Sequence, residues 1–374
     1  MRVGILTFHC APSHGAFFQA YALAKCVEQM GHDAVVLDYM PAHRSDALVE
    51  YCNRIPWSWR RLGFNGVNLI RYRRRRLFRR EANRFLPLTK QTYESIEDIR
   101  TANLHLDACI VGSDQIWNPK LTGGNYDPVY FGAFGPDTMR RISYAPSLGR
   151  SEVPQSEIPI LNDLLAQLDC ISVREPSGTE IIKRVTARQV VQVLDPTFLI
   201  AREDYPRVSD WPQKRKPYVL AYALGEDECF KQHVAATAQA FEMPVLSIGR
   251  DDGFPRYKFP PSPLDLLGLI QNAHHVVTSS FHGVALCLIH HVNFTAVAGS
   301  GEYAAGVCRV EELLALAGLS HRFVAQGSAH HVDLEPIDWM HSDNTLRSAS
   351  IHSREFLLQA LEGCNAISQN NRNR

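Results

Sequence analysis

The sequence has no excess of charge of either sign and no long apolar run, and these absences exclude several classes of protein. Its 39 Lys and Arg residues equal its 39 Asp and Glu residues, so the net charge gives no indication of a nucleic acid partner. No stretch approaches the roughly 20 apolar residues that a membrane-spanning helix needs. The first apolar run, residues 3–8, has the length of a strand and is too short for a signal peptide. We therefore expect a cytoplasmic protein.

The sequence also lacks the usual signatures of metal and dinucleotide sites. Its nine cysteines are scattered and never spaced as Cys-x-x-Cys, which is typical of buried thiols in a reducing compartment. Three His-His doublets occur, but adjacent residues point in different directions and cannot easily share a metal. There is no Asp-x-Asp, and the glycine-rich loop from residue 299 to 306 is not Gly-x-Gly-x-x-Gly. We expect no metal and no cofactor.

What the chain does contain is a repeated alternation of strand and helix patterns. At 374 residues it is long enough for two domains. In the first half the expected strands are 3–8, 33–39, 104–111, 141–145, 170–173 and 190–194, with helices at 16–30 and 163–168. The first three elements form a βαβ unit, whose loop faces the ligand side of an open sheet. Residues 1–205 are thus expected to form a Rossmann-like domain.

After a linker at residues 211–217 the same alternation begins again. The expected strands are 218–223, 245–248, 276–277 and 292–298, and the expected helices are 229–242, 264–272, 283–289 and 310–316. Residues 217–345 are therefore expected to form a second Rossmann-like domain. A helix within 346–367 is expected to pack back on the first domain, and the tail 368–374 to be disordered. The predicted fold is α/β, with two Rossmann-like domains facing across a cleft.

An arginine-rich insertion at residues 57–85 interrupts this pattern. It contains ten arginines and almost no acid, together with Trp57, Trp59 and Phe78. Such a helix is either a solvated insertion that packs on its own domain, or a surface for an anionic membrane, glycan or lipid diphosphate. The second interpretation predicts a peripheral contact with the inner membrane face.

The chemistry is predicted to centre on residues 274–291, which read as a strand, a tight turn and a buried helix. Ser279 and Ser280 are residue types that begin helices, and free backbone N–H groups there, such as that of Gly283, suit a phosphate or carboxylate. His282 then lies at the mouth of an anion site, where an imidazole can transfer a proton. The alternative is a core histidine that is hydrogen-bonded to the turn.

Six motifs in order resemble the polysaccharide pyruvyl transferase family. They are residues 15–23 (GAFFQAYAL), 111–118 (VGSDQIWN), 143–145 (SYA), 172–175 (SVRE), 194–197 (LDPT) and 278–283 (TSSFHG). The resemblance implies a GT-B-like fold and transfer of a pyruvyl group from phosphoenolpyruvate to sugar hydroxyls, with a cyclic ketal formed and phosphate released. The acceptor would be a precursor of a surface polysaccharide or glycolipid, which can be lipid-linked.

The resemblance also implies that residues 1–205 form the acceptor side and residues 217–345 the donor side, and it implies roles for individual residues. It makes His282 the catalytic residue and Arg174 a ligand-binding residue, whereas an ordinary arginine paired with Glu175 is the alternative. Ser280 stands where many members of the family carry Arg, so one cation is missing from the predicted anion site. Arg309, after the glycine-rich loop, either replaces that cation or is an ordinary surface residue.

Four further residues follow expected strand ends of the first domain. Ser13 and His14 come after the first strand and are predicted to bind substrate. Asp114 and Gln115 follow the third expected strand, 104–111, where they either orient the acceptor hydroxyls or stabilise the fold. Two other functions remain open from the sequence, a GT-B glycosyltransferase that uses a sugar nucleotide and a non-catalytic carbohydrate-binding relative.

Overall fold

The computed structural model describes most of the chain, and the statements below concern that part. It covers residues 1–9, 11–41, 66–208, 216–225, 228–248, 253–255, 257, 261–299, 307–327, 332–333 and 335–363, with side chains described except at 66–71 and 307–308. The predicted disordered tail, most of the linker, nearly all of the glycine-rich loop and residues 57–65 of the insertion lie outside these ranges. None of the helices within them is long and apolar enough to cross a membrane.

The first domain is built on a five-stranded parallel sheet with the strand order β3-β2-β1-β4-β5. The strands are β1 (Arg2–Leu6), β2 (Asp33–Tyr39), β3 (Leu88–Tyr93), β4 (Ala108–Val111) and β5 (Arg140–Ser143). The helices are α1 (His14–Gln29), α3 (Gly66–Phe85), α4 (Ile96–Thr101), α5 (Ile158–Leu165) and α6 (Pro176–Val185). A parallel pair, β6 (Ile171–Val173) and β7 (Val190–Gln192), follows β5 through a bridge between Ile142 and Cys170.

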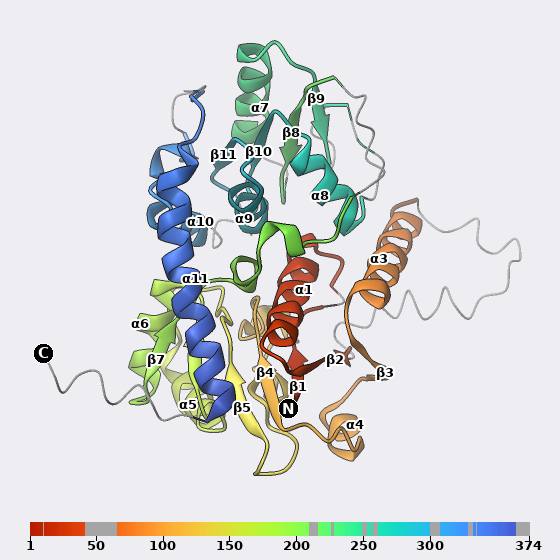
Figure 1. Ribbon diagram of the computed structural model, residues 1–374, viewed down its shortest axis with the longest axis vertical. Coiled ribbons are helices and arrows are strands. Elements are labelled where there is room, and N and C mark those ends of the chain that lie inside the picture. Colours follow the sequence, from red (N-terminus) through yellow and green to blue (C-terminus); the bar gives the residue numbers. More distant parts are fainter. Residues whose placement is uncertain are drawn as a thin grey trace, which may run out of the picture.

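The second domain repeats this plan with the strand order β12-β11-β10-β8-β9, again parallel throughout. Its strands are β8 (Val219–Tyr222), β9 (Val245–Ser247), β10 (His275–Thr278), β11 (Phe294–Val297) and β12 (Phe323–Val324). Its helices are α7 (Glu228–Ala240), α8 (Pro263–Gln271), α9 (Phe281–His290) and α10 (Val307–Leu316). The central strands of both sheets are apolar and buried because helices cover both faces. Two Rossmann-like domains facing each other confirm the predicted GT-B-like fold class (Figure 1).

The last helix, α11 (Trp339–Glu362), leaves the second domain and runs along the first, as Figure 1 shows. The hydroxyl oxygen of Ser353 accepts the backbone N–H of Leu194 at 2.9 Å, and Arg140 donates to the carbonyl of Ala360 at 3.2 Å. Both bonds join α11 to the first domain. One helix therefore connects the two domains along their length.

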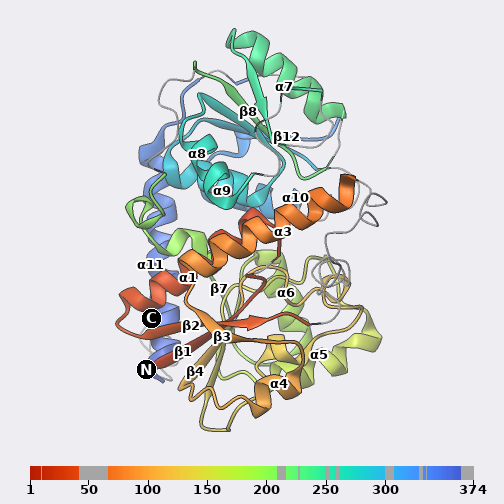
Figure 2. The same cartoon turned by 90° about the vertical axis from the view of Figure 1, so that its right-hand side faces the viewer.

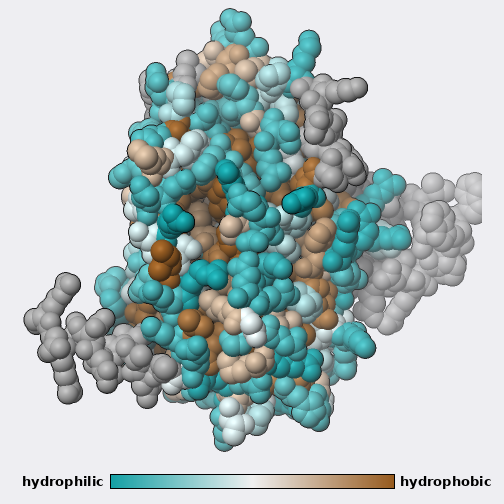
Figure 3. Space-filling view, viewed as in Figure 1, coloured by the Kyte–Doolittle hydropathy of each residue, from teal (hydrophilic) through white to brown (hydrophobic). Residues whose placement is uncertain are grey.

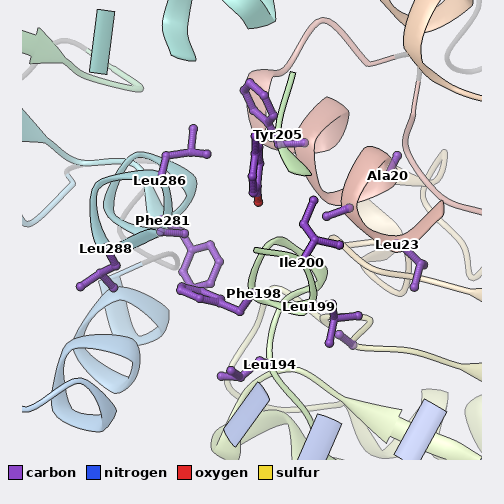
Figure 4. Close-up of a cluster of buried hydrophobic side chains, with 14 of the residues drawn as sticks. Ala20, Leu23, Leu194, Phe198, Leu199, Ile200, Tyr205, Phe281, Leu286 and Leu288 are labelled. Carbon is purple, nitrogen blue, oxygen red and sulfur yellow. The ribbon is translucent and has the colours of Figure 1, made fainter. Parts of the chain in front are cut away.

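A shared apolar core fills the boundary between the domains. Figure 4 shows Phe198 and Leu199 of a short 3-10 helix, η5 (Pro196–Leu199), between Ala20 of α1 and Phe281 of α9. All of these side chains are buried. Figure 3 shows the outer surface of the same view as mainly hydrophilic, with apolar residues scattered over it. The boundary is therefore part of the hydrophobic core, and it fixes the position of the loops that meet there.

Several elements differ from the sequence prediction, which also lacks α4 and β12. The predicted helix 163–168 is wrong at its bounds, because α5 occupies Ile158–Leu165 and begins with Pro159 in its first turn. Strand β3 escapes prediction because its sequence, LTKQTY, is that of a polar edge strand. Helix α6 was also not predicted, although Pro176 at its first position is a typical helix start.

Candidate functional site

The predicted site residues gather where each sheet reverses its strand order. That reversal lies between β1 and β4 in the first domain and between β8 and β10 in the second. In open α/β sheets, ligands bind outside the carboxyl ends of the strands at such a reversal. The loop after β4 carries Asp114 and Gln115, and the turn after β10 carries Ser280 and His282. The two domains present these ends to each other, with α1 packed against both α8 and α9.

His282, the second residue of α9, lies directly on the first turn of α1 in the other domain. A Cβ atom at Gly15 would be 2.1 Å from Nδ1 of His282 and 2.5 Å from Cγ, far inside contact distance. Only glycine therefore allows the imidazole to occupy this position. The side chain is 12% exposed, and its Nε2 has no hydrogen-bond partner among the described residues. This is not the environment of a core histidine that is hydrogen-bonded to its own turn.

Arg174, which follows β6, is buried and not a surface residue. Its Nε donates to Glu175 at 2.8 Å and its Nη1 donates to Asp195 at 2.9 Å. The guanidinium also lies over the ring of Phe281, 4.8 Å from its centroid. Because two of its three nitrogens are occupied, only Nη2, which has no partner among the described residues, is available to a ligand. The guanidinium of Arg174 cannot form a bidentate pair of hydrogen bonds with an anion unless its bond to Glu175 or Asp195 is first broken.

Asp195 joins Arg174 to His282. Its Oδ2 lies 2.9 Å from Nη1 of Arg174 and 3.5 Å from Nε2 of His282. Burial raises the pKa of this carboxyl, but the nearby His282, the charge of Arg174 and the backbone N–H of Thr197 together hold the pKa well below its usual range. Asp195 is therefore ionised at neutral pH although its side chain is fully buried.

Arg309 of α10 lies close enough to interact electrostatically with Arg174, Glu175, Asp114 and Asp195. Burial lowers its pKa, and so does the positive charge of Arg174. Within the described ranges, Nε of Arg309 has no hydrogen-bond partner, and no ion pair joins this side chain to a carboxylate. A buried charged N–H without a partner is unfavourable, and binding of an anion relieves it. Arg309 is thus no ordinary surface residue.

The prediction of an anion site at the start of α9 is wrong in one respect, because the backbone N–H of Gly283 already has a hydrogen-bond partner. Ser280 caps the helix by accepting that N–H at 3.2 Å, and Ser279 accepts the N–H of Leu224 at 3.1 Å. Gly283 is required for packing, since a Cβ there would lie 2.5 Å from Oγ1 of Thr278. The serines therefore shape the turn, and binding of a substrate by Ser279, Ser280 or Gly283 stays a prediction.

His14 is a buried residue at the domain boundary. Its Nε2 donates to the carbonyl of Pro261 at 3.3 Å, and its ring meets Tyr222 and Phe78 edge to face. Burial, with the positive charge of Arg74, lowers the pKa of His14 to about 3. The imidazole is therefore neutral and joins α1, α3 and the second domain. Ser13, by contrast, is exposed and makes no side-chain cap to α1.

Asp114 and Gln115 are partly buried beside the cluster. Asp114 has a left-handed backbone with φ of 68°, and its Oδ1 accepts the N–H of Gln115 at 2.8 Å. Oε1 of Gln115 accepts from Asn118 at 2.8 Å, and only a glycine at position 149 leaves room for it. Asp114 faces the arginines electrostatically, whereas Gln115 supports the loop. Sequence reasoning could assign neither role.

The family model for polysaccharide pyruvyl transferase matches residues 14–301, which include every motif named above, most of the first domain and the second domain through β11. The chain belongs to the polysaccharide pyruvyl transferase family. The match includes Arg174, Asp195 and His282, whereas Arg309 lies beyond its end. This family membership makes the chain a transferase and makes a sugar or polysaccharide acceptor plausible.

Comparison with solved structures finds distant likenesses over nearly the whole chain. Spinosyn forosaminyltransferase SpnP is 12% identical, with a TM-score of 0.44, over 97% of this chain and 95% of that one. A UDP-N-acetylglucosamine 2-epimerase, described as putative, from Listeria monocytogenes is 10% identical, with a TM-score of 0.45, over 96% and 90%. AviGT4, a glycosyltransferase of avilamycin A biosynthesis, is 11% identical, with a TM-score of 0.42, over 97% of both chains. At these scores the likeness says nothing about activity. No curated protein sequence matches the chain.

Asp195 is the site residue that sequence reasoning missed. Asp195 lies in the LDPT motif, just after β7. An acidic residue after the carboxyl end of a predicted strand is the pattern that singled out Asp114, and the same pattern could have indicated Asp195. A cavity of about 630 Å³ lies nearby between β7, α10 and α11, but none of the predicted site residues lines it. The cluster of charged residues at the domain boundary is therefore the candidate site.

Proposed function

We propose that this chain transfers the pyruvyl group of phosphoenolpyruvate to two hydroxyls of a sugar in a surface-polysaccharide or glycolipid precursor. The product would be a cyclic pyruvate ketal, with phosphate released. One observation carries the proposal. Three cationic or protonatable side chains, Arg174, His282 and Arg309, converge at the domain boundary, and each has a buried nitrogen without a partner among the described residues.

Phosphoenolpyruvate suits this arrangement because it carries both a carboxylate and a phosphate. Arg309, which has no carboxylate partner in the described ranges, supplies a full guanidinium for one anionic group. Nη2 of Arg174 supplies a single charged donor for the same or the other group. A hydrogen bond to a charged group contributes about 1.5 to 3 kcal/mol, and more where water is excluded. Arg309 also compensates for the arginine that is missing at Ser280.

The proposed chemistry begins with His282 as a general acid. Protonated His282 donates a proton to the methylene carbon, whose double-bond electrons form the new C–H bond and leave a cation-like centre at the neighbouring carbon. A sugar hydroxyl attacks that centre and returns its proton to the imidazole. The second hydroxyl closes the ring as the C–O bond to phosphate breaks, and its proton leaves with the phosphate. A positioned general acid contributes about 10² to 10⁴ in rate.

The acceptor would approach from the side of α3. Figure 2 shows this helix lying across the boundary between the domains, and its Phe78 contacts His14. The apolar face of α3 packs inward, whereas Arg73, Arg76, Arg80 and Arg84 are exposed at helical spacing. An anionic acceptor, such as a lipid-linked diphosphate at a membrane surface, fits this row by charge. Co-sedimentation with anionic vesicles that is lost in the fourfold Arg→Gln variant tests the contact.

Thermal unfolding with and without ligands tests the proposed donor. Phosphoenolpyruvate at about a hundred times its dissociation constant stabilises a protein by about 2.7 kcal/mol. We expect this stabilisation in the wild type and in Arg347→Gln, which alters an exposed arginine of α11, but not in Arg309→Gln. Stabilisation by a nucleoside diphosphate and none by phosphoenolpyruvate would contradict the proposal and indicate a glycosyltransferase.

Turnover provides the second test. Phosphate release from phosphoenolpyruvate, with transfer of its labelled carbon skeleton to an oligosaccharide acceptor, should occur in the wild type and be lost in His282→Ala. Donor binding should survive that substitution. A wild-type protein that binds an acceptor but catalyses no transfer would be a carbohydrate-binding relative.

A further inference from the structure

Asp195 makes more contacts than its structural position requires. Its Oδ1 accepts both the N–H of Thr197 at 3.0 Å and the hydroxyl of Thr197 at 2.8 Å, and these bonds cap η5. Capping needs only that oxygen. Oδ2 points the other way, toward Nη1 of Arg174 at 2.9 Å and Nε2 of His282 at 3.5 Å. The second oxygen therefore serves the charged cluster and not the helix.

We propose that Asp195 is the positioning residue of His282, and that it fixes the proton of the imidazole on Nε2. This inference rests on the proposed function of His282 as a proton donor. An ionised carboxylate 3.5 Å from Nε2 favours a proton on that nitrogen, because the N–H then points at a negative charge. The contact is longer than a well-formed hydrogen bond, so it would shorten when the ligand is bound.

The consequence is that Nδ1 becomes the nitrogen that exchanges a proton with the substrate. It lies beside the backbone of Gly15 at the start of α1, on the side where the two domains meet. In the protonated ring Nδ1 donates its proton. In the ring left behind, Nε2 keeps its proton and Nδ1 has a lone pair that accepts the hydroxyl proton. A single ring orientation thus supports both steps.

The other charged groups around this pair are consistent with the assignment. Arg174 faces Oδ2 from the end of β6, Arg309 faces it from α10, and Asp114 and Glu175 face both arginines. The nearby His282 and Arg174, together with the backbone N–H of Thr197, lower the pKa of the carboxyl and keep it ionised, so it orients the imidazole without taking its proton. His14 of α1 contributes no charge, because burial keeps it neutral.

Nitrogen-15 NMR of histidine-labelled protein tests the assignment without any need for turnover. The His282 signals are identified by their loss in His282→Gln. We expect the neutral ring of the wild type to carry its proton on Nε2, and Asp195→Asn to shift the population toward the Nδ1 tautomer at least several-fold. Thr197→Val is the matched control, since it removes the hydroxyl bond to Oδ1 and leaves Oδ2 in place. A wild-type ring protonated mainly on Nδ1, or a tautomer ratio that is the same in Asp195→Asn, would overturn the proposal.

Kinetics give a second readout if phosphoenolpyruvate is confirmed as donor. A positioning role predicts that Asp195→Asn lowers kcat by about 10²-fold while KM for phosphoenolpyruvate changes less than tenfold, because Arg174 keeps Glu175 and Arg309 is untouched. Asp195→Glu, which retains the charge, should restore the Nε2 tautomer and part of kcat. Loss of kcat in Asp195→Glu as complete as in Asp195→Asn, at equal thermal stability, would contradict the assignment. Failure of the donor test alone would leave the tautomer measurement valid.

Discussion

Replacing Gly15 by alanine tests the contact between the two domains at His282. The added methyl group would lie 2.1 Å from Nδ1 and 2.6 Å from Cε1 of the imidazole. An ordinary contact needs about 3.4 Å, so the ring must move by about 1.3 Å or turn away from α1. A displacement of about 1 Å in a reacting group can reduce the rate by about 10²-fold.

The folded state of Gly15→Ala should not be destabilised in the way that a loss of packing destabilises a protein. Gly15 has ordinary helical backbone angles, and alanine in a helix is favoured over glycine by about 0.5 to 1 kcal/mol. We therefore expect Gly15→Ala to fold with a Tm within a few degrees of the wild type and yet to lose about 99% of its activity. Binding of phosphoenolpyruvate should change far less, since the arginines are not displaced.

The assay is phosphate release from phosphoenolpyruvate with an acceptor, read beside thermal unfolding and the His282 NMR signals. Gly178→Ala is the matched control, because it also lies in the first turn of a helix but its Cβ would meet nothing closer than 3.5 Å. Activity of Gly15→Ala within threefold of the wild type, with His282 signals unchanged, would refute the reasoning that this ring lies against α1.

Three further predictions concern charge and stability. Arg309→Gln removes a buried charge without a described partner, so the unliganded variant should unfold at a temperature equal to or higher than the wild type. The variant should also lose stabilisation by phosphoenolpyruvate. A lower Tm of the unliganded variant would argue for a structural role of Arg309. Asp38→Asn breaks the bidentate bond from Arg79 and the 2.9 Å contact with His9, and urea unfolding should show a loss of about 3 to 5 kcal/mol. His275 has its pKa lowered to about 3 by burial and by neighbouring positive charge, below its unfolded value of 6.5, so stability is full above pH 6.5 and declines as the pH falls toward 3. At pH 5 this histidine costs about 2 kcal/mol relative to pH 7.5, and His275→Gln should reduce the acid dependence of urea unfolding by that amount.

The sequence alone determined the alternation of strands and helices, because hydrophobic period and helix-ending residues are local properties. Strand 33–39 was predicted at its observed bounds, and α9 within two residues at its start. Local position also selected His282, which lies in the first turn of the helix after a strand, at the end of the sheet where ligands bind. Arg174 was selected by the family resemblance. Strand β3 was missed because its polar residues give no period that distinguishes an edge strand from a loop.

Only the tertiary structure decided what those side chains contact. The hydrogen bond from Arg174 to Asp195 joins residues 21 positions apart, and the contact between Gly15 and His282 joins two domains. Local sequence patterns cannot predict either contact. Burial and pairing depend on residues that are distant in the sequence. For that reason only the structure shows that His14 is neutral at the domain boundary. Only the structure also shows that Arg309 lies near Arg174 and Asp195 without a carboxylate partner in the described ranges. Strand and helix patterns fix where a residue lies along its own element. The packing of one domain on the other determines which charged side chains come into contact, and the candidate site consists of those contacts.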